Sequence, residues 1–209
     1  MRKVLLFLYH FFDKKVKAFF AILNLSIFKS YLFFLTKAKN VDVAIGKVNL
    51  VGLPVITAAS NSILRVGDNV TFVSSRYFNP IGLNKRTNIR LLRNKSKLVI
   101  GNNTGLSGVT ICCEKEITIG NNVGFGANCI IIDTDFHNFR AKEQKDFDDP
   151  ALVPVEPVVI EDNVKIGMNV TILKGVSIGN GTIIAANSTV VKSCPPDSFL
   201  AGNPAKIIN

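Results

Sequence analysis

Aliphatic residues recur at every sixth position in the C-terminal part of the chain. A second register of small or β-branched residues follows the aliphatic residues at an interval of four. A strand repeats its side-chain pattern every two residues and a helix every 3.6, so neither sustains a period of six. The pattern predicts short strands separated by turns, with one aliphatic side chain per repeat in a narrow core. The first register is Ile160, Ile166, Ile172, Ile178, Ile184 and Val190, and the second is Val164, Val170, Val176, Thr182 and Ser188.

The same period extends upstream, with two irregular intervals. It includes Ile119, Phe125 and Ile131, then Ile100 and Leu106, and less regularly Val66 and Phe72. Nineteen positions separate Ile100 from Ile119, one more than three repeats, so one residue bulges. Twenty-nine positions separate Ile131 from Ile160, which predicts an excursion loop at about 133–157. Asn-Asn and Asn-Gly pairs suit the turns between strands. Three repeats form one triangular coil, so residues 41–209 are predicted to fold as an all-β parallel β-helix.

Residues 1–40 are predicted to be a separate, amphipathic α-helical segment. At 100° per residue, residues 3–25 place most of their polar side chains on one face and most of their apolar side chains opposite. Charged residues at 13–15 divide the apolar positions into stretches shorter than the about 20 residues of a membrane span. Two alternatives stay open: peripheral membrane contact through residues 1–35, or packing of the apolar face on the protein or a partner subunit.

The charge of the chain is concentrated in this N-terminal segment. The net charge is +10, of which residues 1–40 carry +7 from eight basic residues and Asp13. Basic charge beside many Phe residues favours an anionic membrane surface over nucleic acid, and no nucleic-acid-binding motif is present. The four cysteines form neither a disulfide framework nor a CxxC metal motif, which indicates a reducing compartment. We therefore expect a cytoplasmic protein, with peripheral contact at the inner membrane face left open. We expect no bound metal.

Three features together resemble one known family. They are the repeats, the segment Asp133-Thr-Asp-Phe-His137 at the start of the excursion, and the closing segment Ala201-Gly-Asn-Pro-Ala-Lys-Ile-Ile208. From about Ile100 onward the chain resembles the hexapeptide-repeat acyltransferases, in particular the galactoside and maltose O-acetyltransferases and those of polysaccharide biosynthesis. The resemblance implies left-handed coils, a homotrimer with active sites between subunits, acetyl-CoA as acyl-donor substrate, and a sugar or glycan hydroxyl as acceptor.

His137 is the candidate catalytic base. Transfer of an acetyl group from a thioester to a hydroxyl needs a group that takes the hydroxyl proton, and neutral imidazole suits this near pH 7. The only other histidine, His10, lies in the N-terminal segment. Asp133 and Asp135 are candidates to orient the imidazole or to bind sugar hydroxyls, with the alternative that they cap a turn. Ser107 and Arg140 are candidates for acceptor binding; Ser107 stands near the place of an active-site Asn in the O-acetyltransferases.

The resemblance also implies which positions bind CoA. It leaves several alternative functions open. The matching positions are Met168, Ala186, Val191, Lys192 and Lys206. The alternative is that Lys192 and, above all, Lys206 are solvated surface charges. An amino-sugar N-acetyltransferase or a serine acetyltransferase stays open within acyl transfer, and a non-catalytic β-helix scaffold stays open outside it. The γ-type carbonic anhydrases share this fold but need three histidines for zinc, which two histidines cannot supply.

Overall fold

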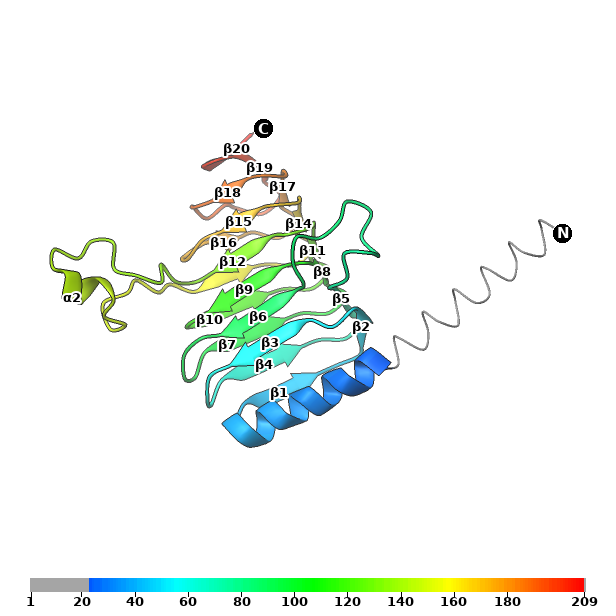
Figure 1. Cartoon of the computed structure of the whole chain (residues 1–209). Coiled ribbons are helices and arrows are strands. Elements are labelled where there is room, and N and C mark those ends of the chain that lie inside the picture. Colours follow the sequence, from blue (N-terminus) through cyan, green and yellow to red (C-terminus); the bar gives the residue numbers. More distant parts are fainter. Residues whose placement is uncertain (1–22, 209) are drawn as a thin grey trace.

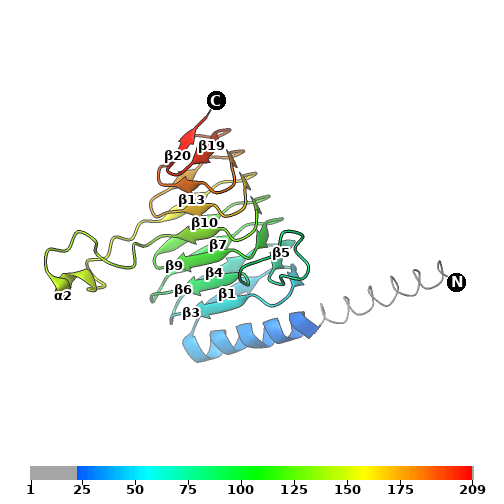
Figure 2. The same ribbon diagram turned by 45° about the horizontal axis from the view of Figure 1, so that its top comes forward.

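The computed structural model describes residues 23–208. A helix of residues 23–39 precedes a stack of triangular coils that ends near β20 (Figures 1 and 2). Successive strands join three sheets in turn, which we call A, B and C. Paired strands are parallel except β19 and β20, which pair antiparallel. The prediction of an all-β, left-handed parallel β-helix preceded by a helical segment is confirmed.

Each sheet contains one strand from nearly every coil. Sheet A contains β1 (Asp42–Ile45), β4 (Ile63–Val66), β7 (Lys97–Ile100), β10 (Glu116–Ile119), β13 (Val158–Ile160) and β16 (Ser177–Ile178). Sheet B contains β2 (Val48–Val51), β5 (Val70–Val73), β8 (Gly105–Ser107), β11 (Gly124–Phe125), β14 (Lys165–Ile166), β17 (Ile183–Ile184), β19 (Phe199–Gly202) and β20 (Ala205–Ile207). Sheet C contains β3 (Val55–Ala58), β6 (Asn88–Leu91), β9 (Thr110–Cys113), β12 (Ile130–Ile132), β15 (Thr171–Ile172) and β18 (Thr189–Val190).

The aliphatic residues of the repeat stack on one another in the core. Strand register in sheet A aligns Val66, Ile100, Ile119, Ile160 and Ile178. Register in sheet B aligns Phe72, Leu106, Phe125, Ile166 and Ile184. None of these side chains is more than 6% exposed. Burying such a side chain contributes about 1.5–3 kcal/mol, so these columns are the main stabilising feature of the coil stack.

The turns between sheets form the three edges of the stack, named A–B, B–C and C–A after the sheets that they connect. On the A–B edge, side-chain amides form a ladder in which each Asn donates to the next at 3.1–3.2 Å. The first four have φ between 56° and 63°, a left-handed conformation that Asn tolerates better than most residues. The ladder is Asn69, Asn103, Asn122, Asn163 and Asn180.

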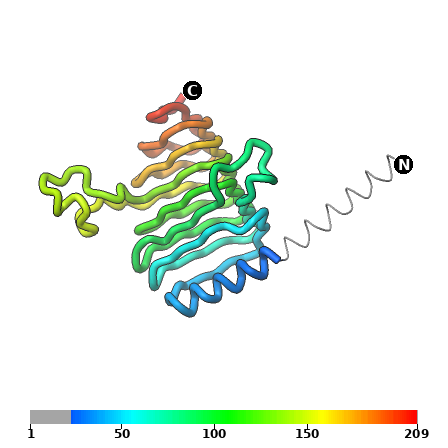
Figure 3. Tube along the Cα trace, viewed as in Figure 1, coloured from blue at the N-terminus to red at the C-terminus, as the bar shows by residue number. Residues whose placement is uncertain are grey.

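Two loops project from the stack on opposite sides (Figure 3). Residues 74–87 connect β5 to β6 at the B–C edge, and residues 133–157 connect β12 to β13 at the C–A edge. The second loop is the predicted excursion and contains the short helix α2 (Gln144–Phe147). Five positions separate Leu106 from Ile111 and eight separate Ile111 from Ile119, so the turn before β9 is one residue shorter and the turn after β9 two residues longer than the period of six requires, a net gain of one.

The helix of residues 23–39 packs across the N-terminal end of the coils (Figures 1 and 2). Phe28, Leu32 and Leu35 are buried in the core, and the Phe28 ring lies 6.4 Å from that of Phe72. The opposite face leaves Phe33 and Phe34 exposed. Most of the predicted amphipathic helix of residues 3–25 lies outside the described residues. Within residues 23–208, no helix has the length and apolar character needed to cross a bilayer.

Candidate active site

His137 lies in the excursion loop, where it is held by residues of the same loop. Its Nδ1 atom lies 2.8 Å from Oδ1 of Asp148. Its ring stacks on the Phe147 ring, with 4.8 Å between centroids and 8° between planes, and meets the edge of Phe139 at 6.1 Å. The backbone N–H of Asn138 donates to the carbonyl of Phe147 at 2.9 Å. These contacts join the two arms of the loop and fix the imidazole plane.

The contact with Asp148 determines which imidazole nitrogen is available. A carboxylate only accepts hydrogen bonds, so neutral His137 donates from Nδ1–H and keeps the lone pair on Nε2. Both side chains are partly exposed, at 46% for His137 and 65% for Asp148. Water can therefore reach the pair. Such an arrangement could act as a general base with an orienting carboxylate.

Asp133 and Asp135 make other contacts. The buried Asp133 carboxylate accepts hydrogen bonds from three consecutive backbone N–H groups at 2.7–2.9 Å, in the turn that follows β9. Asp135 pairs with Lys174 at 3.2 Å, and Lys174 also lies 3.9 Å from Glu156 at the other end of the loop. The Asp133 contacts correspond to the turn-capping alternative, whereas the Asp135 ion pair does not; together they tie the base of the excursion to adjacent coils. A role in substrate binding stays a prediction for both residues.

The remaining predicted site residues lie on two different edges. Ser107, Met168 and Ala186 lie at the B–C edge, where strands of sheet B end. Val191 and Lys192 follow β18 at the C–A edge, the edge from which the His137 loop projects. Arg140 is exposed within that loop, and Lys206 lies in β20 opposite Ala201. A single chain therefore does not bring His137 together with Ser107, Met168 and Ala186, and the CoA assignments stay predictions.

Adjacent coils approach each other closely at the B–C edge, where Gly126 and Gly167 lie. A Cβ atom on Gly126 would lie 2.5 Å from the backbone nitrogen of Met168, and one on Gly167 would lie 2.4 Å from that of Ala186. Such distances are shorter than van der Waals contact, so these positions accept only glycine without a shift of the backbone. The backbones of adjacent coils therefore lie in direct contact at this edge.

Sequence reasoning missed Asp148, the carboxylate that contacts His137. The residue is eleven positions away in an irregular loop, and its only signal was the acidic cluster of Asp146, Asp148 and Asp149. Within the described part of the chain, no group of three or more His, Cys, Asp or Glu side chains could hold a metal ion.

A family model of transferase repeats matches part of the chain. The family described as bacterial transferase hexapeptide (six repeats) matches residues 157–192. The solved N-acyltransferase AntD from Bacillus cereus, in complex with dTDP and 3-hydroxybutyryl-CoA, has a TM-score of 0.61 at 18% identity, over 84% of this chain and 85% of that one. At this identity the likeness concerns the fold alone. The chain thus carries the transferase hexapeptide repeat on a β-helix.

Sequence relatives of the chain are named as acetyltransferases. A protein of Schizosaccharomyces pombe that is named as an acetyltransferase is 42% identical over 92 residues, which are 44% of this chain and 42% of the relative. The 2,3,4,5-tetrahydropyridine-2,6-dicarboxylate N-acetyltransferase of Clostridium perfringens strain SM101 is 54% identical over 52 residues, which are 25% of this chain and 22% of the relative. The chain spans less than half the length of these curated relatives. The predicted resemblance to hexapeptide-repeat acyltransferases is confirmed.

Proposed function

We propose that this chain is an acetyl-CoA-dependent O-acetyltransferase that acts on a sugar or glycan hydroxyl, in surface polysaccharide biosynthesis. The observation that carries the proposal is the contact between His137 Nδ1 and Asp148, which leaves Nε2 free to accept a proton. The repeat of residues 157–192 and the acetyltransferase relatives support the donor class.

In the proposed reaction, the acceptor oxygen attacks the thioester carbonyl carbon while Nε2 of His137 takes the hydroxyl proton. Asp148 stabilises the resulting imidazolium by accepting the hydrogen bond from Nδ1. The tetrahedral intermediate then collapses with cleavage of the carbon–sulfur bond. The departing CoA sulfur takes the proton from His137, so the products are the acetyl ester and the free thiol, and His137 returns to its starting state.

The two edges that carry the site residues support a homotrimer as part of the proposal. His137 projects from the C–A edge, whereas Ser107, Met168 and Ala186 lie along the B–C edge. If the excursion of one subunit lies against the B–C edge of the next, each interface holds one complete site, and cyclic symmetry forms three equivalent sites. Lys192 and Lys206 supply positive charge for the CoA phosphates in this arrangement.

Turnover of acetyl-CoA with a panel of acceptors tests the function. We expect release of the free CoA thiol with free sugars, nucleotide sugars or lipid-linked oligosaccharides as acceptor, and a decrease in kcat of about 10²- to 10⁴-fold in His137→Ala, because the general base is removed. Lys47→Gln, an exposed residue on the A–B edge, is the control for handling and stability. Full activity of His137→Ala on its best acceptor would refute the mechanism. No turnover with any acceptor would favour a non-catalytic scaffold.

An amine acceptor is the second candidate, favoured by the name of the Clostridium perfringens N-acetyltransferase. The same panel should include amino sugars and serine, and faster turnover of these than of their hydroxyl analogues would select the amine.

The cytoplasmic location and the peripheral membrane contact through residues 1–35 are also proposals. Within that range, Phe33 and Phe34 are 65% and 59% exposed, and Lys29 lies on the same helix. Flotation of the full-length protein with anionic but not with neutral liposomes is the expected result.

A further inference from the structure

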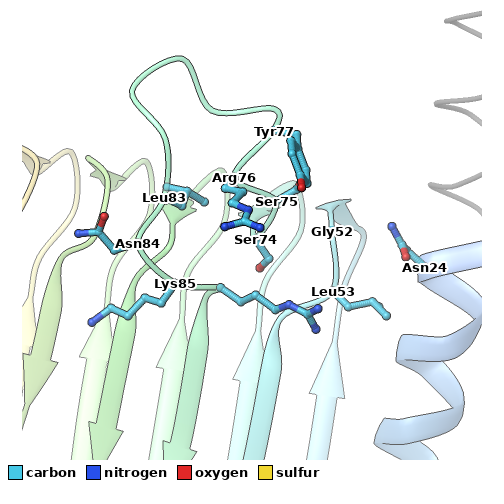
Figure 4. A pocket seen from close by; sticks show the side chains of 11 residues that line it. Asn24, Gly52, Leu53, Ser74, Ser75, Arg76, Tyr77, Leu83, Asn84 and Lys85 are labelled. Atoms are coloured by element: carbon cyan, nitrogen blue, oxygen red, sulfur yellow. The ribbon is translucent and has the colours of Figure 1, made fainter.

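A cleft of about 520 Å³ lies at the B–C edge, near the N-terminal end of the coils. It is bounded by the 74–87 loop, by the turn after β2 at Gly52 and Leu53, and by Asn24 of the N-terminal helix (Figure 4). Asn84 and Lys85 lie toward one end of the cleft and Asn24 lies at the other (Figure 4). None of the residues that the sequence singled out lines this cleft.

The charge of the cleft is of one sign. Its lining includes Arg76, Lys85 and Arg86 and no Asp or Glu. Among residues 23–208, none of the ion pairs involves these three cations, whereas Arg65, Arg93 and Lys97 are each paired with a carboxylate. Cations gathered in a concave surface without carboxylates produce a positive potential that attracts an anion.

The polar groups around these cations match the oxygens of a phosphate. The Arg76 guanidinium lies over the Tyr77 ring, 5.4 Å from its centroid, which restrains the direction of its donors. Ser74, Ser75 and the Asn84 amide add hydrogen-bonding groups to the lining. Guanidinium groups bind phosphate oxygens in bidentate fashion, and arginine is the preferred partner where such planar recognition occurs.

The cleft lies next to the proposed acceptor position on the same edge. The Lys85 carbonyl oxygen approaches Gly108 so closely that a Cβ there would lie 2.9 Å from it. The backbone N–H of Asn84 donates to Asn128 Oδ1 at 2.9 Å, one coil further on. Adjacent coils are spaced by about 4.8 Å. Along this edge the order is therefore the cationic cleft, Ser107, and then the CoA positions Met168 and Ala186.

We propose that this cleft binds the phosphate or diphosphate group of a phosphate-bearing acceptor, so that the attached sugar extends toward Ser107 and the acetyl donor. The existence of the phosphate site stands on the cleft itself, and only the role of its ligand as acceptor rests on the proposed function. The shared chemistry is a phosphoester, whether its other end is a nucleoside or a lipid.

Binding of inorganic diphosphate to the full-length protein tests the site directly by calorimetry. We expect the double variant Arg76→Gln/Arg86→Gln to bind diphosphate about tenfold more weakly or worse, because two charge-assisted contacts are removed. The matched control is Lys47→Gln/Lys115→Gln, which removes the same charge from exposed positions outside the cleft. Equal diphosphate affinity in the two double variants would overturn the proposal. It would also be overturned if the unmodified protein bound neither diphosphate nor the vesicles described below.

Two further experiments identify the source of the phosphate and separate this proposal from the acetyltransferase activity. Binding of uridine diphosphate would indicate a nucleotide, and binding to phosphatidylcholine vesicles only when they contain phosphatidylglycerol would indicate a lipid headgroup. Loss of either interaction in Arg76→Gln/Arg86→Gln but not in the control double variant supports the cleft. Acetyl-CoA binding is measured in parallel. Retained acetyl-CoA binding with lost diphosphate binding supports the proposal, whereas diphosphate binding without acetyl-CoA binding supports the phosphate site while contradicting the proposed enzyme.

Discussion

At the scale of single residues, Asp148 determines how His137 presents its nitrogens. An amide at this position can donate a hydrogen bond to Nδ1, which would move the imidazole proton to Nε2 and remove the base. Because both side chains are partly exposed and water can compensate, we expect Asp148→Asn to lower kcat by about 10- to 100-fold, with the KM for acetyl-CoA unchanged. Asp149→Asn is the matched control, since its Oδ1 only accepts from the Ala151 N–H. Equal kcat values for the two variants would contradict the orienting role.

Because of the Cys129 thiol, we expect the free energy of unfolding to decrease at alkaline pH. Burial raises the pKa of this thiol to about 11, whereas an unfolded cysteine titrates near about 8.5. The folded state therefore keeps its proton while the unfolded state loses it, so the stabilisation is complete below about pH 8.5 and decreases as the pH rises toward 11. Denaturant unfolding at several pH values, under reducing conditions, should show this decrease and a shallower one in Cys129→Ala. Identical pH dependence in both proteins would exclude this thiol as a cause.

At the scale of secondary-structure elements, the coils followed from the sequence where each repeat has the same length. From Ile160 to Val190 every sixth residue enters the core, and the strand register is as the spacing predicts. The N-terminal coils were harder to predict because their strands have four residues and their turns vary, so the period is irregular between Val66 and Ile100. The loop of residues 74–87 has no repeat, and its cationic cleft depends on residues that only the fold brings together.

One face of the N-terminal helix, over residues 23–39, packs into the hydrophobic core. Phe28 is 2% exposed and packs against Phe72, so Phe28→Ala removes a fully buried ring and leaves a cavity. We expect a decrease of about 3–5 kcal/mol in the free energy of unfolding, measured by urea denaturation. The control Phe33→Ala changes a residue that is 65% exposed and should alter stability by about 0.5 kcal/mol or less. A similar loss in both variants would mean that Phe28 does not contribute through packing.

At the scale of the whole molecule, sequence analysis identified His137 as the candidate base but could not place it relative to the other candidates. The period of six fixes which residues point inward, yet it does not show which turns share an edge until three sheets are aligned. Once they are aligned, His137 lies on a loop at the C–A edge and Met168 and Ala186 lie at the B–C edge. The candidate base and these two predicted CoA positions therefore lie on different edges of a single chain.

This separation leads to a prediction about mixed oligomers. If each site joins the excursion of one subunit to the B–C edge of another, His137→Ala and Ala186→Phe inactivate different halves of the site. Homotrimers of either variant should be inactive, but trimers that contain both have interfaces where an intact loop meets an intact edge. Random mixing at equal amounts should restore about one quarter of all sites, which is about one third of the sites in the mixed trimers that carry both tags. Co-expression with two affinity tags, tandem purification and a thiol-release assay measure this, and the two purified variants combined without subunit exchange are the control. If His137 and Ala186 instead served one site within a single subunit, co-expression would restore no activity, because every chain in the mixture carries one inactivating substitution.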